Sequence, residues 1–243
     1  MKSVSVLFDL DGTLTDPREG FVSSITHALV SLGHCSPPED ELASNIGPPL
    51  EITLAKLLGE QHEHQIPEAV SLYRQRYSSQ GLFENSVYDG IEGALSRVQA
   101  SGARLFVATS KPQVFAVRIL EHFGLQKFFT GIYGSGLDGS LTNKDELIAH
   151  ILEKEALEPE AALMIGDRAH DVVGALANGI CPVGVLWGYG SIEELSSAGA
   201  AVLVRSPEQL PDVLSSNPVF ERAAPTPALW LRSACAVSRK DAD

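Results

Sequence analysis

The chain has 243 residues, 44% of them hydrophobic, so it can bury a sizeable core as one large domain or as a domain with an insertion. A formal net charge of -13 argues against binding to a nucleic-acid backbone, although it leaves small anionic substrates open. The three cysteines, Cys35, Cys181 and Cys235, are too scattered for a metal cluster, and their odd number does not suggest a disulfide framework.

The first predicted element is a buried strand at residues 4–8, which ends at the segment Asp9-Leu-Asp11-Gly-Thr13. Two acids one residue apart at the carboxyl end of a strand, followed by Gly and a hydroxyl, suit phosphoryl chemistry at the mouth of an α/β sheet. Taken alone, the same segment is also compatible with a polar turn.

An all-helical region is predicted next. Apolar residues recur at helical spacing over Phe21–Leu32, Ile52–Leu58 and Glu68–Tyr77. Because this region begins a few residues after the two acids, we expect it to cover them as a lid does.

After residue 90, short apolar runs alternate with helical patterns. The predicted strands are 104–108, 132–133, 162–165 and 183–186, and the predicted helices are 114–123, 145–155 and 169–178. Strands separated by helices of this length imply a parallel sheet with right-handed crossovers.

The predicted fold class is therefore α/β, a Rossmann-like parallel-sheet core with an inserted α-helical cap. We expect the core to comprise residues 1–15 and 86–215 and the cap residues 16–85. Residues 216–243 lack clear periodicity and are interpreted as an irregular tail, although the apolar patch at 228–231 also suits docking on the body or on a partner.

Further polar side chains follow the later strands and share the sheet edge with the two acids. They are Thr109, Ser110, Lys111, Asp167 and Asp171, with Lys144 at the start of a predicted helix. Several carboxylates together with hydroxyl and ammonium groups match a Mg²⁺ and phosphate site, because Mg²⁺ takes oxygen ligands. For the same reason we expect His170 to be a neighbour of the site and not a ligand.

The motifs Asp9-x-Asp11-Gly-Thr13, Thr109, Lys144 and Gly166-Asp167-x-x-x-Asp171 occur in this order at the ends of predicted elements. In this set and order the chain resembles the haloacid dehalogenase-like hydrolase superfamily. The helical insertion, Thr-Ser-Lys-Pro at 109–112 and Trp-Gly-Tyr-Gly at 187–190 resemble its phosphoglycolate phosphatase-like branch. The resemblance covers residues 4 to about 214.

This resemblance implies a role for each catalytic residue. Asp9 would be the nucleophile that becomes an aspartyl-phosphate, which water later hydrolyses. Asp11 would protonate the leaving alkoxide and then take a proton from the attacking water. Thr109 would hydrogen-bond the transferring phosphoryl oxygens, and Lys144 would neutralise charge on the phosphate and the nucleophile.

A divalent cation is expected because the nucleophile and the phosphate are both anionic. At ~4 Å each like-charge pair costs about 1 kcal/mol in bulk water and about 4 kcal/mol at an effective dielectric of ~20. The resemblance implies Mg²⁺ held by the side chains of Asp9 and Asp167 and the backbone carbonyl of Asp11. Asp171 would be an outer anchor or an indirect ligand.

Substrate identity depends on the cap and is less determined. The predicted substrate contacts are Thr13, Ser110, Lys111, Gly47 and Arg74; Gly47 lies in a Gly-Pro loop and Arg74 on a cap helix. The resemblance places phosphoglycolate first. 5′-Nucleotidases share this architecture, and no residue excludes a nucleoside leaving group.

Three other activities fit the sequence less well than hydrolysis. A dehalogenase has no phosphate leaving group to protonate, phosphoglucomutase-like enzymes more often have Glu-Asp where this chain has Gly166-Asp167, and a non-catalytic binding module would not need intact catalytic positions. The prediction is a phosphomonoester hydrolase that acts on a small phosphorylated metabolite, with no nucleic-acid polymer or membrane as partner. It is expected in the cytoplasm, because no run suits a membrane span or a signal peptide. The sequence does not determine the oligomeric state.

Overall fold

The computed structural model of this chain describes residues 4–216, so residues 217–243 of the tail predicted at 216–243 lie outside the described residues. Six strands form one parallel sheet in the order β5-β4-β1-β6-β7-β8. Their bounds are β1 Ser5–Phe8, β4 Arg104–Pro112, β5 Gly131–Ser135, β6 Ala162–Gly166, β7 Cys181–Val185 and β8 Val202–Val204. The predicted α/β fold is confirmed.

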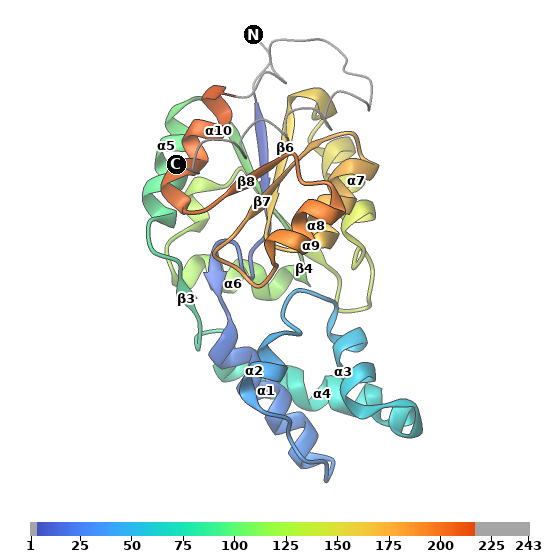
Figure 1. The fold of residues 1–243 in the computed structure, drawn as a ribbon. Coiled ribbons are helices and arrows are strands. Elements are labelled where there is room, and N and C mark those ends of the chain that lie inside the picture. Colours follow the sequence, from blue (N-terminus) through green and yellow to red (C-terminus); the bar gives the residue numbers. More distant parts are fainter. Residues whose placement is uncertain (1–3, 217–243) are drawn as a thin grey trace, which may run out of the picture.

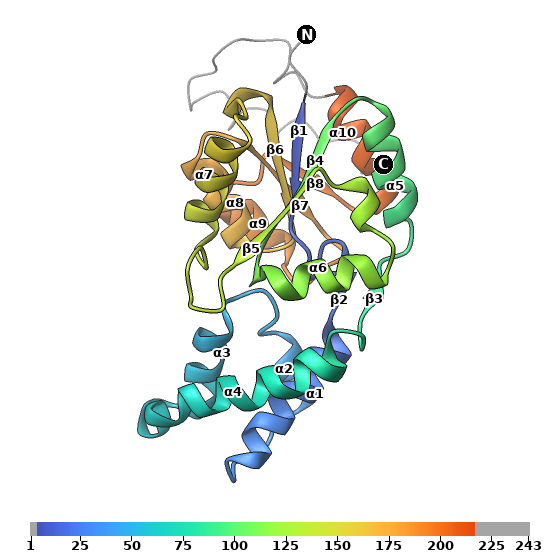
Figure 2. The same ribbon diagram turned by 180° about the vertical axis from the view of Figure 1, so that it is seen from behind.

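Helices cover both faces of this sheet (Figures 1 and 2). On one face lie α5 (Ile91–Ala100), α6 (Gln113–His122) and α10 (Leu210–Ser216), and on the other α7 (Lys144–Lys154), α8 (Ala169–Ala177) and α9 (Ile192–Ala198). All four residues of β1 are buried. Val6 and Phe8 pack into the core on the α5 and α6 face, whereas Leu7 packs into the core on the α7 and α8 face. This alternation explains why a strand between two helix layers is hydrophobic throughout.

A second group of helices lies beyond the carboxyl edge of the sheet and is called the helical cap here (Figure 1). It contains α1 Arg18–Ser31, α2 Glu39–Ala43, α3 Leu50–Leu58, α4 Ile66–Arg76, a 3₁₀-helix at Glu60–Gln65 and a π-helix at Tyr77–Gly81. The chain enters and leaves it through β2 (Thr15–Asp16) and β3 (Ser86–Val87), which pair antiparallel. The helices expected from the apolar spacing are thus present. The division of the chain into domains at the predicted boundaries stays a prediction.

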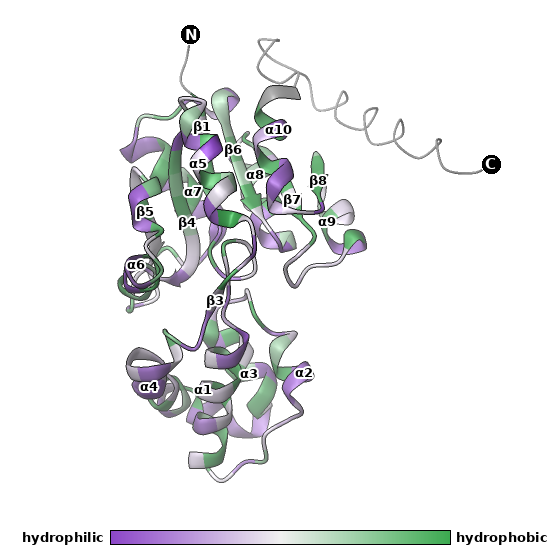
Figure 3. Ribbon diagram, turned by 90° about the vertical axis from the view of Figure 1, so that its left-hand side faces the viewer, coloured by the Kyte–Doolittle hydropathy of each residue, from purple (hydrophilic) through white to green (hydrophobic). Residues whose placement is uncertain are grey.

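Hydropathy follows these layers, because the strands and the inward helix faces are hydrophobic and the outward faces are mostly hydrophilic (Figure 3). Within residues 4–216, no helix has both the length and the apolar character that a membrane crossing requires. The carboxyl edge of the sheet, between the core and the cap, is where polar side chains converge.

Candidate active site

The polar side chains expected at the strand ends meet in the crevice between β1 and β6. Asp9 follows β1, Asp167 follows β6, and Thr109 lies near the end of β4. Lys144 begins α7, and Asp171 lies in the first turn of α8. Each of these residues is at most 4% exposed. The chain leaves β1 toward one face of the sheet and β6 toward the other, and ligands of α/β sheets bind at such a point.

Lys144 is the buried cation of this cluster. Its Nζ lies 2.9 Å from Asp9 Oδ1 and 2.7 Å from Asp171 Oδ1, and it donates a hydrogen bond to the carbonyl of Ala108 at 2.8 Å. Burial alone lowers the pKa of Lys144, but Asp171 and Asp9 outweigh burial and raise it. The ammonium is therefore a fixed positive charge beside the predicted nucleophile.

The negative charge of the cluster's carboxylates exceeds the positive charge of its one ammonium group. Burial and the nearby Asp171 raise the pKa of Asp9 against the attraction of Lys144. Burial, Asp171 and Asp9 likewise raise the pKa of Asp167 well above its ordinary value. Only for Asp171 do Lys144 and His170 outweigh burial, so that its pKa is lowered. Several buried carboxylates close together, with only one ammonium among them, suit a hard divalent cation such as Mg²⁺.

Asp167 is held in one orientation by its neighbours. Its Oδ1 accepts a hydrogen bond from the Thr13 hydroxyl at 3.3 Å, and its Oδ2 accepts one from the backbone N–H of Tyr189 at 2.8 Å. Gly12 lies against the same carboxylate with φ of +84°, and a Cβ there would be 2.2 Å from Asp167 Oδ2. Only glycine fits this close approach. The Trp187 indole N–H donates to the carbonyl of Thr13 at 2.9 Å and fixes the same loop.

Asp171 has partners for both of its oxygens. Besides the ion pair of Oδ1 with Lys144, Oδ2 accepts a hydrogen bond from the backbone N–H of Arg168 at 3.1 Å. In this arrangement Asp171 orients Lys144. The metal-ligand assignments of Asp9, Asp11, Asp167 and Asp171 stay predictions.

His170 also lies close to the acids. It offers a ligand atom within 4.8 Å of ligand atoms of Asp9 and Asp171, a spacing that a metal ion can bridge. However, the Lys144 ammonium already lies against both carboxylates, so a cation held by this trio would meet a positive charge. The imidazole Nε2 is buried, has no hydrogen-bond partner and lies 3.7 Å from Asp171 Oδ1. That His170 is a neighbour of the site and not a metal ligand therefore stays a prediction.

Asp11 lies on the pocket side of the cluster and is paired with Lys111. The Lys111 Nζ is 2.7 Å from Asp11 Oδ2 and 2.9 Å from Asp11 Oδ1. The same ammonium donates a hydrogen bond to the hydroxyl of Tyr77, which belongs to the cap. Lys111 therefore joins the predicted acid and base to the cap.

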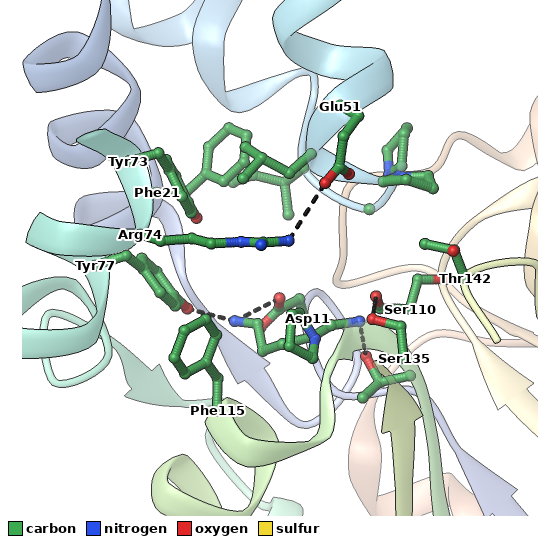
Figure 4. Close-up of a pocket in the computed structure, with 18 of the residues that line it drawn as sticks. Asp11, Phe21, Glu51, Tyr73, Arg74, Tyr77, Ser110, Phe115, Ser135 and Thr142 are labelled. Carbon is green, nitrogen blue, oxygen red and sulfur yellow. Dashed lines mark hydrogen bonds and ion pairs between the residues drawn. The ribbon is translucent and has the colours of Figure 1, made fainter. Parts of the chain in front are cut away.

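A pocket between the core and the cap opens onto these groups (Figure 4). The core supplies Asp9, Asp11, Thr109, Ser110, Lys111, Pro112, Phe115, Ser135, Gly136, Gly139 and Thr142. The cap supplies Phe21, Ile46, Gly47, Pro48, Pro49, Leu50, Glu51, Tyr73, Arg74 and Tyr77. Of the predicted substrate contacts, Ser110, Lys111, Gly47 and Arg74 line the pocket. Thr13 does not line it and is fully buried, with its hydroxyl on Asp167.

Arg74 extends across the pocket toward α3 (Figure 4). Its Nη2 lies 3.3 Å from Glu51 Oε1, and its Nη1 donates to the carbonyl of Leu137 in the core at 3.1 Å. On another side, the Arg168 guanidinium of the core donates to the carbonyl of Ile46 in the cap. The cap is thus closed over the pocket by polar contacts from both sides.

Some pocket residues were not anticipated from the sequence. Glu51, Tyr73 and Tyr77 line the pocket, and the last two are four residues apart along one helical stretch. Residues at this spacing share a helix face, so two tyrosines there beside Arg74 were a readable signal. Glu51 had no comparable signal, because an acid in the first turn of a helix is common.

Known proteins resemble the chain along most of its length. A sequence profile described as haloacid dehalogenase-like hydrolase matches residues 6–185. A 5′-nucleotidase of Pseudomonas aeruginosa is 49% identical over 191 residues, which cover 79% of this chain and 86% of that protein. The tyrosine-protein kinase PtkA of Mycobacterium tuberculosis is 45% identical over 203 residues, which cover 83% of this chain and 68% of that protein.

Solved structures give the same result. The crystal structure of a predicted phosphatase from Clostridium acetobutylicum superimposes with a TM-score of 0.84 at 41% identity and covers 89% of this chain and 100% of that one. A phosphoglycolate phosphatase of Agrobacterium fabrum is a more distant relative in sequence, with 28% identity over 92% of this chain and 91% of its own. The fold of most of this chain therefore has a counterpart in a solved structure described as a predicted phosphatase.

Proposed function

The chain belongs to the haloacid dehalogenase-like hydrolase family and is a phosphatase of that family; on this premise we propose a Mg²⁺-dependent phosphomonoester hydrolase that works through an aspartyl-phosphate. The observation that carries the proposal is the buried contact of Lys144 with Asp9 beside a pocket that also exposes Asp11. A carboxylate, a fixed ammonium and a second carboxylate facing the ligand are the groups that phosphoryl transfer needs.

In this mechanism Asp9 attacks the phosphorus of the bound ester, and the bond to the leaving oxygen breaks. The Lys144 ammonium, 2.9 Å from Asp9, brings the two anions together, and Thr109 orients the phosphoryl oxygens from the end of β4. Asp11 gives its proton to the leaving oxygen. In the second step Asp11 takes a proton from water, which hydrolyses the aspartyl-phosphate and releases phosphate.

The residues fit a Mg²⁺ ion, because Asp9 and Asp167 are buried carboxylates whose pKa values are raised by burial and by their neighbours. Their side chains and the backbone carbonyl of Asp11 would hold it. Bound there, the ion supplies charge stabilisation for the phosphoryl group. Thr13 and Tyr189 keep Asp167 in place for this role.

For the substrate class we favour nucleoside 5′-monophosphates over phosphoglycolate. Among the described pocket-lining residues the cations are Arg74 and Lys111. Arg74 pairs with Glu51, and Lys111 is held between Asp11 and the Tyr77 hydroxyl. The carboxylate of glycolate would therefore meet Glu51 instead of an unpaired cation. The aromatic side chains of Phe21 and Tyr73 on the cap suit a nucleobase, which gains about 1–3 kcal/mol by stacking on an aromatic ring. The 5′-nucleotidase relative at 49% identity supports this choice.

The test is phosphate release by the purified protein with Mg²⁺ or with EDTA, across nucleoside 5′-monophosphates, phosphoglycolate, sugar phosphates and p-nitrophenyl phosphate. We expect metal-dependent release with the highest kcat/KM for a nucleoside monophosphate. A preference for phosphoglycolate would overturn the substrate class and keep the phosphatase, whereas full activity in EDTA would overturn the metal. A parallel incubation with ATP and a tyrosine peptide tests for phosphoryl transfer to tyrosine, because the relative PtkA is named a tyrosine-protein kinase.

A further inference from the structure

Tyr77 is a cap residue whose polar end lies in the active site. The residue is 1% exposed, and its ring stacks on Tyr73 at 5.1 Å between centroids and meets Phe115 of the core edge-on at 5.7 Å. Its hydroxyl accepts a hydrogen bond from the Lys111 ammonium (Figure 4). A buried hydroxyl is costly without a partner, so this contact fixes the position of the lysine as well as that of the tyrosine.

Lys111 connects this hydroxyl to both oxygens of Asp11. Its Nζ is 2.7 Å and 2.9 Å from the two oxygens and 4.8 Å from the centroid of the Tyr77 ring. The side chain of Lys111 is 8% exposed and that of Asp11 is 17% exposed, so water screens the contact weakly. Tyr77, Lys111 and Asp11 form one continuous chain of contacts from the cap to the core.

The backbone of the cap is irregular where Tyr77 lies. The α-helix α4 ends at Arg76, and residues Tyr77–Gly81 form a π-helix. Short π-helical turns are rare and frequently occur at functional sites, since they change the direction of a side chain relative to the helix before them. Here the turn begins at the residue that reaches the core.

We infer that Tyr77 is a positioning residue through which closure of the cap completes the general acid. The inference rests on the proposed function, in which Asp11 gives a proton to the leaving oxygen and becomes an anion. The ammonium of Lys111 stabilises that developing negative charge. The Tyr77 hydroxyl holds the ammonium against Asp11, and it does so only while the cap lies on the core.

The experiment compares Tyr77→Phe with the wild-type chain in single-turnover reactions with enzyme in excess, following release of the leaving group. One ester is a nucleoside 5′-monophosphate, whose alkoxide must be protonated as it leaves. The other is p-nitrophenyl phosphate, whose leaving group departs as a stable anion. The control is Tyr133→Phe, which also removes a buried hydroxyl contact, in that case to Glu155, away from the pocket.

We expect Tyr77→Phe to slow nucleoside release about tenfold, which is a fraction of the 10²–10⁴-fold rate enhancement that general acid–base catalysis typically supplies. We expect the same variant to change the rate of p-nitrophenolate release less than about twofold. Tyr133→Phe is expected to match the wild-type chain on both esters. Equal slowing of both esters, or of neither, would overturn the inference while leaving the phosphatase intact. A wild-type chain that releases neither leaving group would overturn the proposed function and this inference with it.

Discussion

Burial of Asp167 raises the pKa of its carboxyl group and makes folding stability depend on pH. Its pKa is raised above the ordinary value by burial and by the charges of Asp171 and Asp9. The protonated form is therefore favoured in the folded protein, and folding stability falls as pH rises from the ordinary pKa to the raised one. The metal-free protein therefore carries more of the cost of this charge as the pH rises through that range.

The first prediction follows from that cost. Asp167→Asn is expected to raise the Tm of the metal-free protein at pH 7 by a few degrees, since about 1 kcal/mol corresponds to ~2–4 °C for a chain of this size. The amide fits, because its oxygen accepts from the Tyr189 N–H and the Thr13 hydroxyl can turn to accept from its nitrogen. Thermal melts with and without Mg²⁺ check this. Mg²⁺ should raise the Tm of the wild-type chain and not that of the variant.

A matched control is Asp89→Asn, which neutralises an exposed aspartate and should leave the Mg²⁺ response unchanged. If Asp167→Asn lowered the Tm of the metal-free protein, or kept the full Mg²⁺ response, the assignment of Asp167 as a metal-binding carboxylate would be wrong.

A second prediction concerns the nucleophile. Asp9→Asn should lower turnover of every phosphate ester by more than about a thousandfold, because an amide cannot form the acyl-phosphate. The side chain keeps its shape and can still accept a hydrogen bond from Lys144, so the melting temperature should stay within a few degrees of the wild-type value. Phosphate release and thermal melting measure the two effects separately. Activity near the wild-type level in a folded Asp9→Asn protein would refute the nucleophile assignment.

Sequence patterns predicted which residues converge at the sheet edge far better than they predicted the contacts of those residues. Asp9, Thr109 and Lys144 were expected at one sheet edge because the carboxyl ends of parallel strands converge, and they do converge. The same rule does not predict which partners a side chain contacts across the pocket. For Thr13, which was predicted as a substrate contact, the structure places the hydroxyl on Asp167 and the residue outside the pocket lining.

At the scale of elements, the packing of α1 against the π-helix determines where the cap tyrosine lies. Gly20 in α1 meets the π-helix so closely that a Cβ there would be 2.0 Å from the carbonyl oxygen of Gly81. The Gly20 N–H also donates to the carbonyl of Glu84 at 2.9 Å. The contact is between backbones, so no side-chain movement can relieve it.

The third prediction tests this contact. Gly20→Ala is expected to destabilise the protein by about 1–3 kcal/mol, as overpacking does. Gly93→Ala is the matched control, because Gly93 is exposed within α5 and nothing lies within 4 Å of a Cβ there. This control should stabilise the protein by about 0.5–1 kcal/mol through helix propensity. Urea denaturation measures both. Similar changes for the two variants would refute the packing argument.

Several elements of clear periodicity were predicted, but α5 at Ile91–Ala100 and the shortest strands were not. The helix expected at 114–123 is α6 at Gln113–His122, and the strand expected at 162–165 is β6 at Ala162–Gly166. The three-residue β8 and the two-residue β2 and β3 were not expected, because segments this short have no periodicity to read. Their pairing depends on tertiary contacts, which local sequence does not encode.

At the scale of the whole molecule, contacts between the cap and the core set the shape of the pocket. Lys111 reaches Tyr77, Arg168 reaches Ile46, and Arg74 reaches Leu137. The lid position of the cap followed from the insertion point of the helices just after Asp9 and Asp11. The pairs themselves join residues tens of positions apart, which no sequence period connects.

The fourth prediction concerns how the charge of Glu51 in this pocket affects the binding of two substrate classes. Glu51 faces the pocket from α3 with its side chain 48% exposed, and it pairs with Arg74 at 3.3 Å. An exposed pair of this kind contributes little to stability, so Glu51→Gln should fold as the wild-type chain does. The variant removes a negative charge that repels a carboxylated substrate and leaves the Arg74 guanidinium without its carboxylate partner.

We therefore expect Glu51→Gln to lower KM for phosphoglycolate about fivefold, which corresponds to ~1 kcal/mol of charge interaction at a partly hydrated site. KM for a nucleoside 5′-monophosphate should change less than about twofold, since neither base nor ribose carries a negative charge. Initial rates across substrate concentrations measure both constants. Glu41→Gln, which neutralises an exposed glutamate in α2, is the control and should change neither. An unchanged KM for phosphoglycolate would mean that Glu51 does not determine the choice of substrate, and the preference for an uncharged leaving group would then have to arise elsewhere in the pocket.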